Sequence, residues 1–287
     1  MRSFLTRILP ELIRFKISLS VTLSAFAAWV VASGKVSVKS ILPIAGIFVL
    51  SCGASVLNQI QEKEQDAKMD RTKNRPIPSD KLTSQQAFLI ALLLLFSGFA
   101  VLASGFYWTC VILGMLNIFW YNGFYTWLKK KTAFAVVPGA LSGVIPVFMG
   151  WSAAGGSLTD RPALLLAFFL FIWQIPHFWL LMLKYGDEYR LAGFPVMTDI
   201  FNIYQFRNII LAWMIGATGT SLLLVLSGFW MFFLSKVMII GLNLLILALF
   251  FYQLYFAKNP RYRLMFITMN AFLLLVLGMV VMEKFFS

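Results

Sequence analysis

Cysteine, histidine and charged residues are scarce in this sequence. Its 287 residues include two cysteines, Cys52 and Cys110, and a single histidine, His177. Both cysteines fall inside apolar stretches without neighbouring ligand residues, which argues against a disulfide framework and a cysteine-based metal site. Charged residues make up 12% of the chain and hydrophobic residues 60%, with a mean hydropathy of +0.84. This composition excludes an ordinary water-soluble domain.

Long apolar runs recur along the whole sequence. Each approaches the roughly 20 residues that a helix needs to cross the hydrocarbon core of a bilayer. Because backbone amides in lipid must be satisfied within the segment or by a closed barrel, continuous runs without strict alternation predict helices. We therefore predict an all-α polytopic membrane protein, with one domain over residues 1–287 built as a nine-helix bundle. The predicted spans are 15–33, 40–57, 86–104, 107–126, 134–151, 163–183, 208–228, 235–256 and 264–282.

The net charge of +13 could indicate either a nucleic-acid partner or the orientation of a membrane protein. The distribution of the basic residues along the chain distinguishes the two. With nine spans and an inner N-terminus, 19 of the 24 lysines and arginines fall in segments on the inner side. The positive-inside rule explains this asymmetry, and nucleic-acid binding is not expected. We predict a bacterial plasma (inner) membrane protein whose N-terminus and two long polar loops are cytoplasmic and whose C-terminus lies outside.

A row of oxygen-bearing side chains follows the second predicted span. Asn58, Glu62 and Asp66 are spaced by four, so they lie on one face if the helix continues. Amide and carboxylate oxygens suit Mg²⁺, and Arg71 and Arg75 nearby could hold a phosphate through their guanidinium forks. The pattern indicates a site for Mg²⁺ and a diphosphate. It fits equally well a solvated helix joined by ion pairs between residues four apart.

Two other places carry candidate residues. Gln174 and His177 lie one turn apart beside Trp173 in an otherwise apolar helix, where polar groups are costly unless they face a cavity or a partner. The alternative is a satisfied histidine near an interfacial belt of aromatic residues. Lys129 opens a run of three lysines after the fourth span, which serves orientation by default and would strengthen a positive mouth for an anionic substrate.

Together these residues resemble a known family. The row from Asn58 to Asp66 is similar to the N-x-x-x-D-x-x-x-D motif of the intramembrane prenyltransferases, which are nine-helix bundles. The continuation from Asp66 to Pro76 is similar to the protohaem IX farnesyltransferase, or haem O synthase, family. The resemblance extends from about Phe15 to Pro195. Further agreement is found at Tyr125, Thr126, Leu128, Lys129 and Thr132, at Trp173, Gln174, Pro176, His177 and Phe178, and at Tyr189, Ala192, Gly193 and Pro195.

The resemblance implies transfer of a farnesyl group from farnesyl diphosphate to a vinyl group of protohaem IX, in haem A/O biosynthesis for terminal oxidases. It implies Mg²⁺ as cofactor and haem as a substrate. Expected partners are both substrates, the lipid bilayer and a haem A synthase or terminal-oxidase assembly. The implied catalytic and metal residues are Asn58, Glu62 and Asp66, with Lys184, Asp187 and Tyr189 from the second polar loop. The implied diphosphate contacts are Arg71, Arg75 and Lys129, and the haem contacts His177, Gln174 and Trp173.

Two departures and two alternatives accompany this interpretation. Glu62 replaces the usual aspartate, and residues 196–199 after Pro195 read Val-Met-Thr-Asp, where the family more often has a Met/Val-Leu-Pro-Val run. The second polar loop is also poor in paired aspartates, which argues against a second Mg²⁺ there. A prenyltransferase with an aromatic or quinone-precursor acceptor would share the site but not the match around His177. A transporter or channel should carry buried ionisable residues, which the last seven predicted spans almost lack. Aromatic faces suited to a carbocation are expected from Trp120, Tyr121, Tyr125 or Phe178.

Overall fold

The computed structural model describes residues 8–105, 107–227 and 232–286, and within these ranges it contains helices and no strand. Turns and short loops join the helices. The elements are α1 (Leu9–Leu12), α2 (Phe15–Ser33), η2 (Val38–Ser40), α3 (Ile41–Gln61), α4 (Lys63–Lys68), α5 (Ser84–Ser104), α6 (Trp108–Ile118), η3 (Phe119–Tyr125), α7 (Thr126–Leu128), η4 (Ala133–Ala135), α8 (Val136–Gly139), α9 (Leu141–Ala153), α10 (Arg161–Leu191), η5 (Met197–Asp199), α11 (Ile203–Leu226), α12 (Phe233–Phe251), η6 (Tyr252–Phe256) and α13 (Tyr262–Phe286).

Where the chain is described, the predicted spans correspond to helical segments; residue 228, the last of the predicted span 208–228, lies outside the described residues. In the described part of the chain, eight segments are long and apolar enough to cross a membrane. The remaining prediction, 107–126, falls on a divided segment, because α6 runs directly into the π-helix η3 and then into α7, covering residues 108–128. The all-α membrane-bundle prediction is therefore confirmed, and the predicted count of nine spans agrees approximately with eight long apolar helices and this divided segment.

Large apolar side chains cover the outer surface of the bundle. Phe96 on α5 is 76% exposed, and Phe233 and Leu244 on α12 are 81% and 65% exposed. Such an extensive apolar surface is unfavourable in water and favourable against hydrocarbon. The outer faces of α5 and α12 are therefore lipid-facing surfaces.

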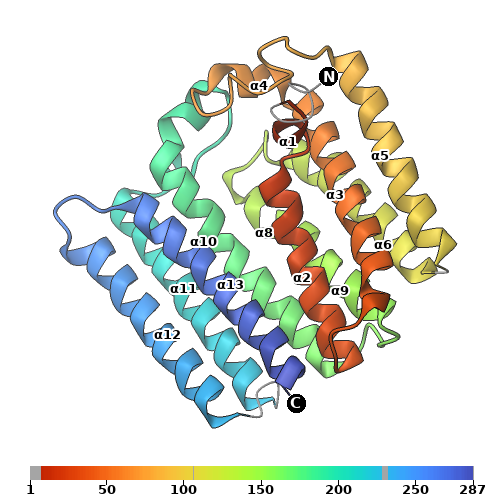
Figure 1. The fold of residues 1–287 in the computed structure, drawn as a ribbon. Coiled ribbons are helices and arrows are strands. Elements are labelled where there is room, and N and C mark those ends of the chain that lie inside the picture. Colours follow the sequence, from red (N-terminus) through yellow and green to blue (C-terminus); the bar gives the residue numbers. More distant parts are fainter. Residues whose placement is uncertain (1–7, 106, 228–231, 287) are drawn as a thin grey trace.

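The long helices run side by side in two groups that meet at the middle of the bundle (Figure 1). One group holds α10, α11, α12 and α13, and the other holds α3, α5 and α6. Helices α2 and α9 connect the groups. Helix α2 packs against α9 and α13, and α10 also packs against α9 and α13. Helices α1 and α4 lie at one end, whereas α13 finishes at the other.

Local signals set where two of the membrane helices begin. Thr83 and Gln86 form a capping box at the start of α5, and Asn202 and Gln205 form another at the start of α11. In both, a side chain accepts from an otherwise unpaired backbone amide of the first turn. The first capping box ends the polar loop before α5, and the second ends the polar loop before α11.

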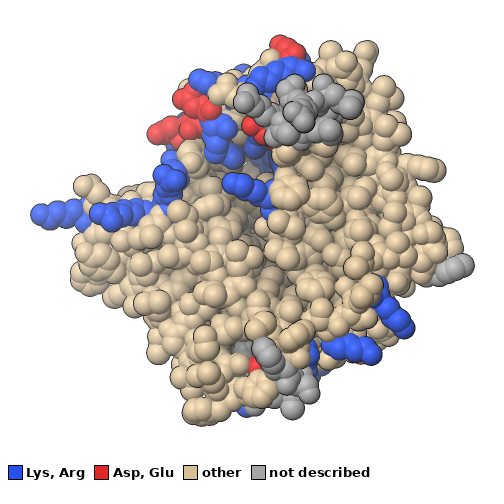
Figure 2. Space-filling model, in the orientation of Figure 1, with Lys and Arg blue, Asp and Glu red and all other residues tan. Residues whose placement is uncertain are grey.

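Charged side chains gather at the end of the bundle that carries α4 (Figure 2). Basic and acidic groups are mixed there around a hollow, whereas only a few charges are visible at the opposite end. The middle of the visible surface is nearly free of charge. This concentration of charge at one end agrees with the prediction that most basic residues lie on one side of the membrane.

Close contact between α2 and α9 depends on Gly150. A Cβ atom added there would lie 1.9 Å from the carbonyl oxygen of Ala25 on α2. Helices in lipid associate through packing, so small residues at a crossing let two backbones approach. The α2–α9 contact shapes one wall of the cavity described below.

We expect Gly150→Ala to destabilise the protein by about 1–3 kcal/mol, because backbone rather than a flexible side chain must move. Gly241→Ala is the matched control, since a Cβ at that helical position meets nothing within 4 Å. It should be neutral or stabilising by up to about 1 kcal/mol. Thermal unfolding of both variants in detergent checks this, and equal unfolding temperatures would contradict the close-packing role.

Candidate active site

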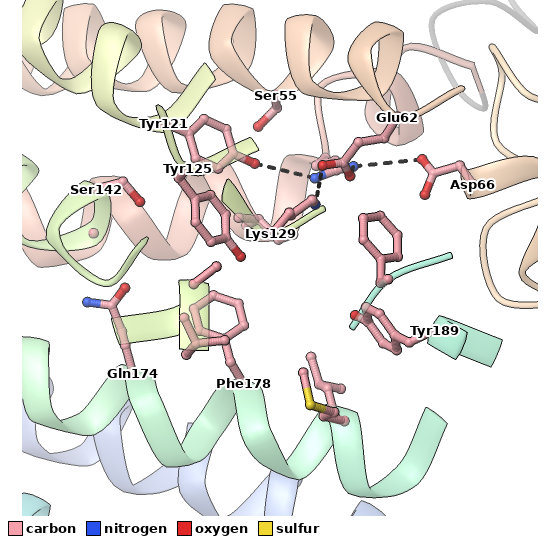
Figure 3. Close-up of a pocket in the computed structure, with 18 of the residues that line it drawn as sticks. Ser55, Glu62, Asp66, Tyr121, Tyr125, Lys129, Ser142, Gln174, Phe178 and Tyr189 are labelled. Carbon is pink, nitrogen blue, oxygen red and sulfur yellow. Dashed lines mark hydrogen bonds and ion pairs between the residues drawn. The ribbon is translucent and has the colours of Figure 1, made fainter. Parts of the chain in front are cut away.

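A cavity of about 280 Å³ lies between the two helix groups at the charged end. Its outer part is polar and contains Glu62, Asp66 and Lys129 (Figure 3). Its inner part is lined by Tyr125 and Phe178 and extends toward Gln174. The cavity can therefore accept an anionic head at one end and an apolar chain at the other.

The predicted oxygen row is buried, and its two carboxylates, Glu62 and Asp66, line this cavity, whereas Asn58 is not among the described lining residues. Helix α3 ends at Gln61, and Glu62 has non-helical backbone angles. Even so, the Glu62 amide donates to the Asn58 carbonyl at 3.1 Å and the Asp66 amide to the Glu62 carbonyl at 2.7 Å. These bonds keep the three side chains on one face. Because they are only 0%, 4% and 1% exposed, the solvated-helix alternative is wrong.

The row ends where the helix ends. Met69 adopts extended backbone angles after α4. Asp70, which is the next residue at the four-residue spacing, is 80% exposed at its side chain and pairs with Lys73 at 2.5 Å. Sequence spacing alone would have included Asp70, but the break after α4 turns it away from the cavity.

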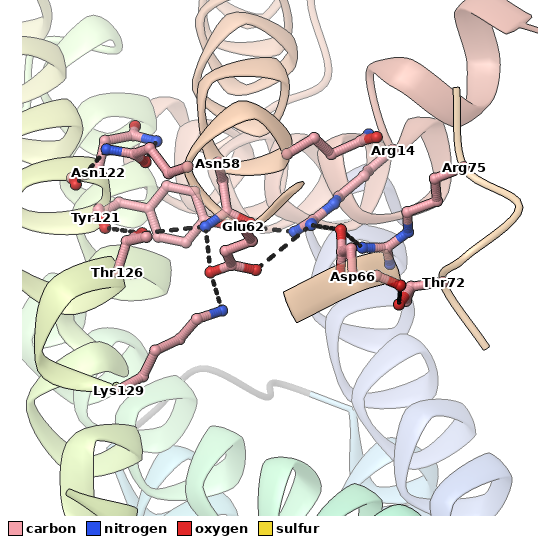
Figure 4. Close-up of polar contacts among 12 residues, drawn as sticks. Arg14, Asn58, Glu62, Asp66, Thr72, Arg75, Tyr121, Asn122, Thr126 and Lys129 are labelled. Carbon is pink, nitrogen blue, oxygen red and sulfur yellow. Dashed lines mark hydrogen bonds and ion pairs between the residues drawn. The ribbon is translucent and has the colours of Figure 1, made fainter. Parts of the chain in front are cut away.

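Three cations compensate the two buried carboxylates (Figure 4). Glu62 forms an ion pair with Lys129, and Asp66 with Arg75 at 2.7 Å. The Arg14 guanidinium lies 3.9 Å from a carboxylate oxygen of each. Isolated charges would be very costly at this burial, so the cations stabilise both carboxylates.

The cations also settle the charge state of Glu62. Burial acts to raise the pKa of its carboxyl, but the Lys129 ammonium and the Arg14 guanidinium outweigh this effect and hold the pKa below its ordinary value. Asn58 adds a hydrogen bond from Nδ2 to Oε1 at 2.8 Å. Glu62 is therefore an anion at neutral pH and can serve as an oxygen ligand.

Arg14 is the main site residue that the sequence did not identify as functional. It precedes α2 with φ 47° and ψ 53°, a left-handed conformation that is uncommon for a non-glycine residue. Its Nη1 lies 3.5 Å from the Tyr121 hydroxyl, which it reaches across 107 residues of sequence. In the sequence it was only a basic residue before the first span, and no spacing relates it to Glu62 or Asp66.

The π-helix η3 is fixed to the polar end of α3. Gln61 donates to the Asn122 carbonyl at 2.9 Å, and Asn122 donates to the Gln61 side-chain oxygen at 3.2 Å. Asn58 donates to Thr126 Oγ1 at 3.0 Å. π-Helical segments often occur at functional sites. Here the segment carries Tyr121 and Tyr125, whose side chains line the cavity.

Arg71 joins the two long polar loops. Its backbone amide donates to Glu188 Oε2 at 3.2 Å, and its Nη2 to the Tyr189 hydroxyl at 3.3 Å. The structure thus brings Arg71 and Tyr189 together with Arg75 around the cavity. This contact joins residues 118 positions apart, so the spacing of residues in the sequence did not predict it.

Two candidates from the second polar loop lie away from this cluster. Lys184 donates to the Tyr185 hydroxyl at 2.7 Å, and Asp187 has a 96% exposed side chain that pairs with Arg190. Neither is among the described residues that line the cavity. Helix α10 has non-helical angles at Tyr185, which rotates the following turn and brings Tyr189 inward.

The three haem-side candidates divide between two faces of α10. Gln174 lines the cavity and donates to the Leu170 carbonyl at 3.1 Å. Trp173 instead donates to the Met269 carbonyl of α13 at 3.1 Å. His177 stacks between Trp173 and Phe266, with ring centroids 4.7 and 4.6 Å away, and its buried Nδ1 has no partner among the described residues.

The predicted aromatic faces are largely in place. Tyr121, Tyr125 and Phe178 all line the cavity. Trp120 points elsewhere and donates to the Pro138 carbonyl at 2.8 Å. Three of the four aromatic candidates can therefore face an apolar or cationic group in the cavity.

The site contains donors that fit Mg²⁺. Asn58 Oδ1 is buried without a hydrogen-bond partner among the described residues, and Nδ2 of the same side chain donates to the Glu62 carboxylate. No cluster of three or more histidine, cysteine, aspartate or glutamate residues occurs in the described ranges. Mg²⁺ commonly takes one or two carboxylates and completes its shell with water and substrate phosphate. The donor set therefore fits Mg²⁺ that arrives with an anion.

The overall charge of the cavity favours such an anion. Four basic side chains and two carboxylates line it, which leaves an excess of two positive charges; the basic residues are Arg14, Arg71, Arg75 and Lys129. Low-dielectric walls strengthen the attraction of this excess for an anion. Fold and site together define a polytopic helical membrane protein with an anion-attracting, oxygen-donor cavity above an apolar chamber.

The chain belongs to the UbiA prenyltransferase family, whose model matches residues 18–279. It is 37% identical over 190 residues to the protoheme IX farnesyltransferase of Oleidesulfovibrio alaskensis, covering 66% of this chain and 67% of that protein. It is 32% identical over 291 residues to that of Christiangramia forsetii, covering 96% and 92%. The match to the Geobacter sulfurreducens enzyme is 40% identical but covers 54% of this chain and 57% of that protein.

Solved structures show the same fold. A chain described under the biosynthesis of digeranylgeranylglyceryl phosphate synthase in membranes matches with a TM-score of 0.77 at 15% identity, covering 100% of both chains. A UbiA homologue from Archaeoglobus fulgidus bound to DMAPP and Mg²⁺ matches with a TM-score of 0.65 at 13% identity, covering 95% of this chain and 99% of that one.

We expect Lys129→Met to destabilise the ligand-free protein by up to about 3 kcal/mol, because it leaves buried Glu62 with only a more distant cation. Adding Glu62→Gln to this variant should recover much of the loss. Lys130→Met is the control, since among the described residues the Lys130 ammonium bonds to the Gln61 carbonyl and forms no ion pair with a buried carboxylate. Thermal unfolding of wild type, Lys129→Met, Glu62→Gln, the double variant and the Lys130→Met control measures the coupling, and additive effects in the double variant would contradict it.

Proposed function

We propose that this protein transfers a farnesyl group from farnesyl diphosphate to a vinyl group of protohaem IX, producing haem O. The observation that carries the proposal is the buried row of Asn58, Glu62 and Asp66, whose two carboxylates face cations at the mouth of a cavity with an aromatic interior. Membership of the UbiA prenyltransferase family and similarity to protoheme IX farnesyltransferases support the same activity.

The donor head would bind at the polar end. Asn58, Glu62 and Asp66 would hold Mg²⁺, which supplies charge neutralisation for the departing diphosphate. Arg14, Arg75 and Lys129, which pair with the carboxylates in the ligand-free protein, would turn to the phosphate oxygens. Arg71 would close over the head from the side of Tyr189. Guanidinium groups suit this role because they contact phosphates through two donors at once.

The reaction would begin when the bond between farnesyl C1 and the diphosphate oxygen breaks, the electron pair leaving with the diphosphate. The vinyl group of haem would then donate its π electrons to C1, forming a carbon–carbon bond. Water would add to the resulting benzylic-type cation and lose a proton, giving the hydroxyalkyl side chain. Tyr121, Tyr125 and Phe178 would shield and stabilise the allylic cation, at about 0.5–2 kcal/mol for each well-placed ring.

The acceptor would approach from the side of α10. Gln174 lies inside the cavity, and His177 and Trp173 form the adjacent face toward α13. The buried Nδ1 of His177 has no partner in the described part of the chain, and haem recognition is proposed to depend on this residue, through the iron or a propionate. Lys184 and Asp187 remain proposed contributors from the second polar loop, although the structure places them outside the cluster around Asp66.

We further propose a place for the protein in the cell. Charge at the α4 end supports a bacterial plasma membrane location with that end cytoplasmic, so that the C-terminal end of α13 faces outside. Water-soluble diphosphate would then enter and leave from the cytoplasm. The product would pass to a haem A synthase or to terminal-oxidase assembly, because haem O is an intermediate or a prosthetic group of those systems.

Replacing Asp66 should abolish the proposed reaction. We expect Asp66→Ala to lower haem O formation by at least about 100-fold, because both a metal ligand and the partner of Arg75 are lost. Asp70→Ala removes a carboxylate from the same four-residue series that is exposed and outside the cavity, and it should retain activity. Pigment analysis of membranes containing equal amounts of each inserted protein measures the difference, and near-normal haem O from Asp66→Ala would sink the proposal.

The acceptor can be tested separately from the donor. Purified protein with labelled farnesyl diphosphate and Mg²⁺ should transfer label to haem and not to 4-hydroxybenzoate. Label in 4-hydroxybenzoate with none in haem would instead identify a prenyltransferase that uses an aromatic or quinone-precursor acceptor. Because both arms share the donor site, this assay isolates acceptor choice.

His177→Ala should weaken haem binding while leaving diphosphate binding intact. The ring lies on the α13 side of α10 and is not among the described residues that line the cavity, whereas Arg14, Arg75 and Lys129 line it. Optical titration with haem and a separate titration with diphosphate and Mg²⁺ distinguish the two sites. Unchanged haem affinity in this variant would refute the proposed role of His177.

A further inference from the structure

A second hollow lies between the cytoplasmic halves of α10 and α13. This basic groove has a volume of about 480 Å³ and is lined by Lys184, Arg261, Tyr262, Arg263, Leu264 and Ile267. None of these residues is among those that line the cavity at Glu62. The groove is therefore separate from the cavity at Glu62, and Lys184, a proposed contributor to farnesyl transfer, is one of its lining residues.

The backbone that carries the two arginines is held in place by polar contacts. The Arg261 amide donates to the side-chain oxygen of Gln253, which is only 7% exposed, at 2.9 Å. Arg207 donates to the Leu254 carbonyl and to the Tyr262 hydroxyl, both at 3.2 Å. These contacts hold the turn between α12 and α13 in a defined conformation. The two arginines therefore have fixed backbone positions at the groove.

The basic groups of the groove differ from those elsewhere at this end. Lys63, Lys73 and Arg190 each pair with an exposed carboxylate. Among the described residues, Arg261 and Arg263 form no ion pair. Figure 2 likewise shows basic side chains without acidic neighbours where Figure 1 places the turn between α12 and α13. The positive charge of Arg261 and Arg263 is therefore available to an anionic ligand.

Apolar side chains continue the groove toward the middle of the bilayer. Leu264 and Ile267 follow Arg263 along α13, and Ile267 is 51% exposed. An amphiphile with an anionic head and an apolar chain matches this order of charged rim and apolar wall. A free diphosphate would use the rim alone and gain nothing from the wall.

We propose that the basic groove binds an anionic phospholipid, with its phosphate between Arg261 and Arg263 and an acyl chain along Leu264 and Ile267. Basic pockets between transmembrane helices on the cytoplasmic side are suited to anionic headgroups, because each nearby cation adds to the attraction. Arginine forks can contact phosphate oxygens through two donors. The bound lipid would stabilise the α10–α13 seam, which also holds His177 against Phe266.

The test measures binding of phosphatidylglycerol to the purified full chain in a neutral detergent. Wild-type protein should bind phosphatidylglycerol and not phosphatidylcholine with the same acyl chains. Arg261→Gln with Arg263→Gln should weaken binding roughly 30-fold, the effect expected from two lost cations. Lys63→Gln with Lys73→Gln is the matched control, since it removes two charges from the same end. That control should bind like wild type.

Several results would overturn the proposal. Equal weakening in the two double variants would mean a general attraction of the positive end for anionic lipid. Displacement of phosphatidylglycerol by an equal concentration of inorganic diphosphate would identify a free phosphate as the ligand. A lysine pair, Arg261→Lys with Arg263→Lys, guards against misfolding of the glutamine variant. It should retain most of the binding, and loss of binding in a folded lysine variant would also count against the site.

Discussion

Burial of two carboxylates beside an apolar chamber requires positive partners, and the α4 end of the bundle is organised around them. Glu62 and Asp66 are 4% and 1% exposed, and Arg14, Arg75 and Lys129 reach them from three different parts of the chain. An unpaired carboxylate at this burial would be neutralised or would destabilise the fold. The cations therefore hold α2, the loop after α4 and the end of α7 around one point. The hydrogen bonds of Asn58 and Gln61 add η3 to the same assembly.

The same pairing makes the site ready for the proposed reaction. In the ligand-free protein Arg14, Arg75 and Lys129 share the two carboxylates, so neither carboxylate is left unpaired beside the apolar interior. Mg²⁺ and diphosphate entering together would let carboxylates and cations exchange partners without leaving a buried charge alone. A bare metal ion would meet a cavity with an excess of two positive charges, which opposes its entry. The arrangement thus favours the complete donor over either component.

Much of the fold could be predicted because it follows from local rules. Apolar length predicted every span, and four-residue spacing predicted the shared face of Asn58, Glu62 and Asp66. Neither rule reaches across the chain. Arg14 adjoins Asp66 only after α2 packs beside α3, and Arg71 meets Tyr189 only when two loops 118 residues apart come together. The break at Tyr185 likewise separates Lys184 from Tyr189, although the sequence places them in one polar loop.

The account depends on metal and diphosphate entering as a pair, and calorimetric titration of the purified protein tests this directly. Mg²⁺ alone, up to millimolar concentration, should produce no saturable binding heat. The same titration in the presence of inorganic diphosphate should show saturable binding that Asp66→Ala removes. Tight saturable binding of Mg²⁺ without diphosphate would contradict the account, because it would mean that the carboxylates are available to the metal while their cations remain in place.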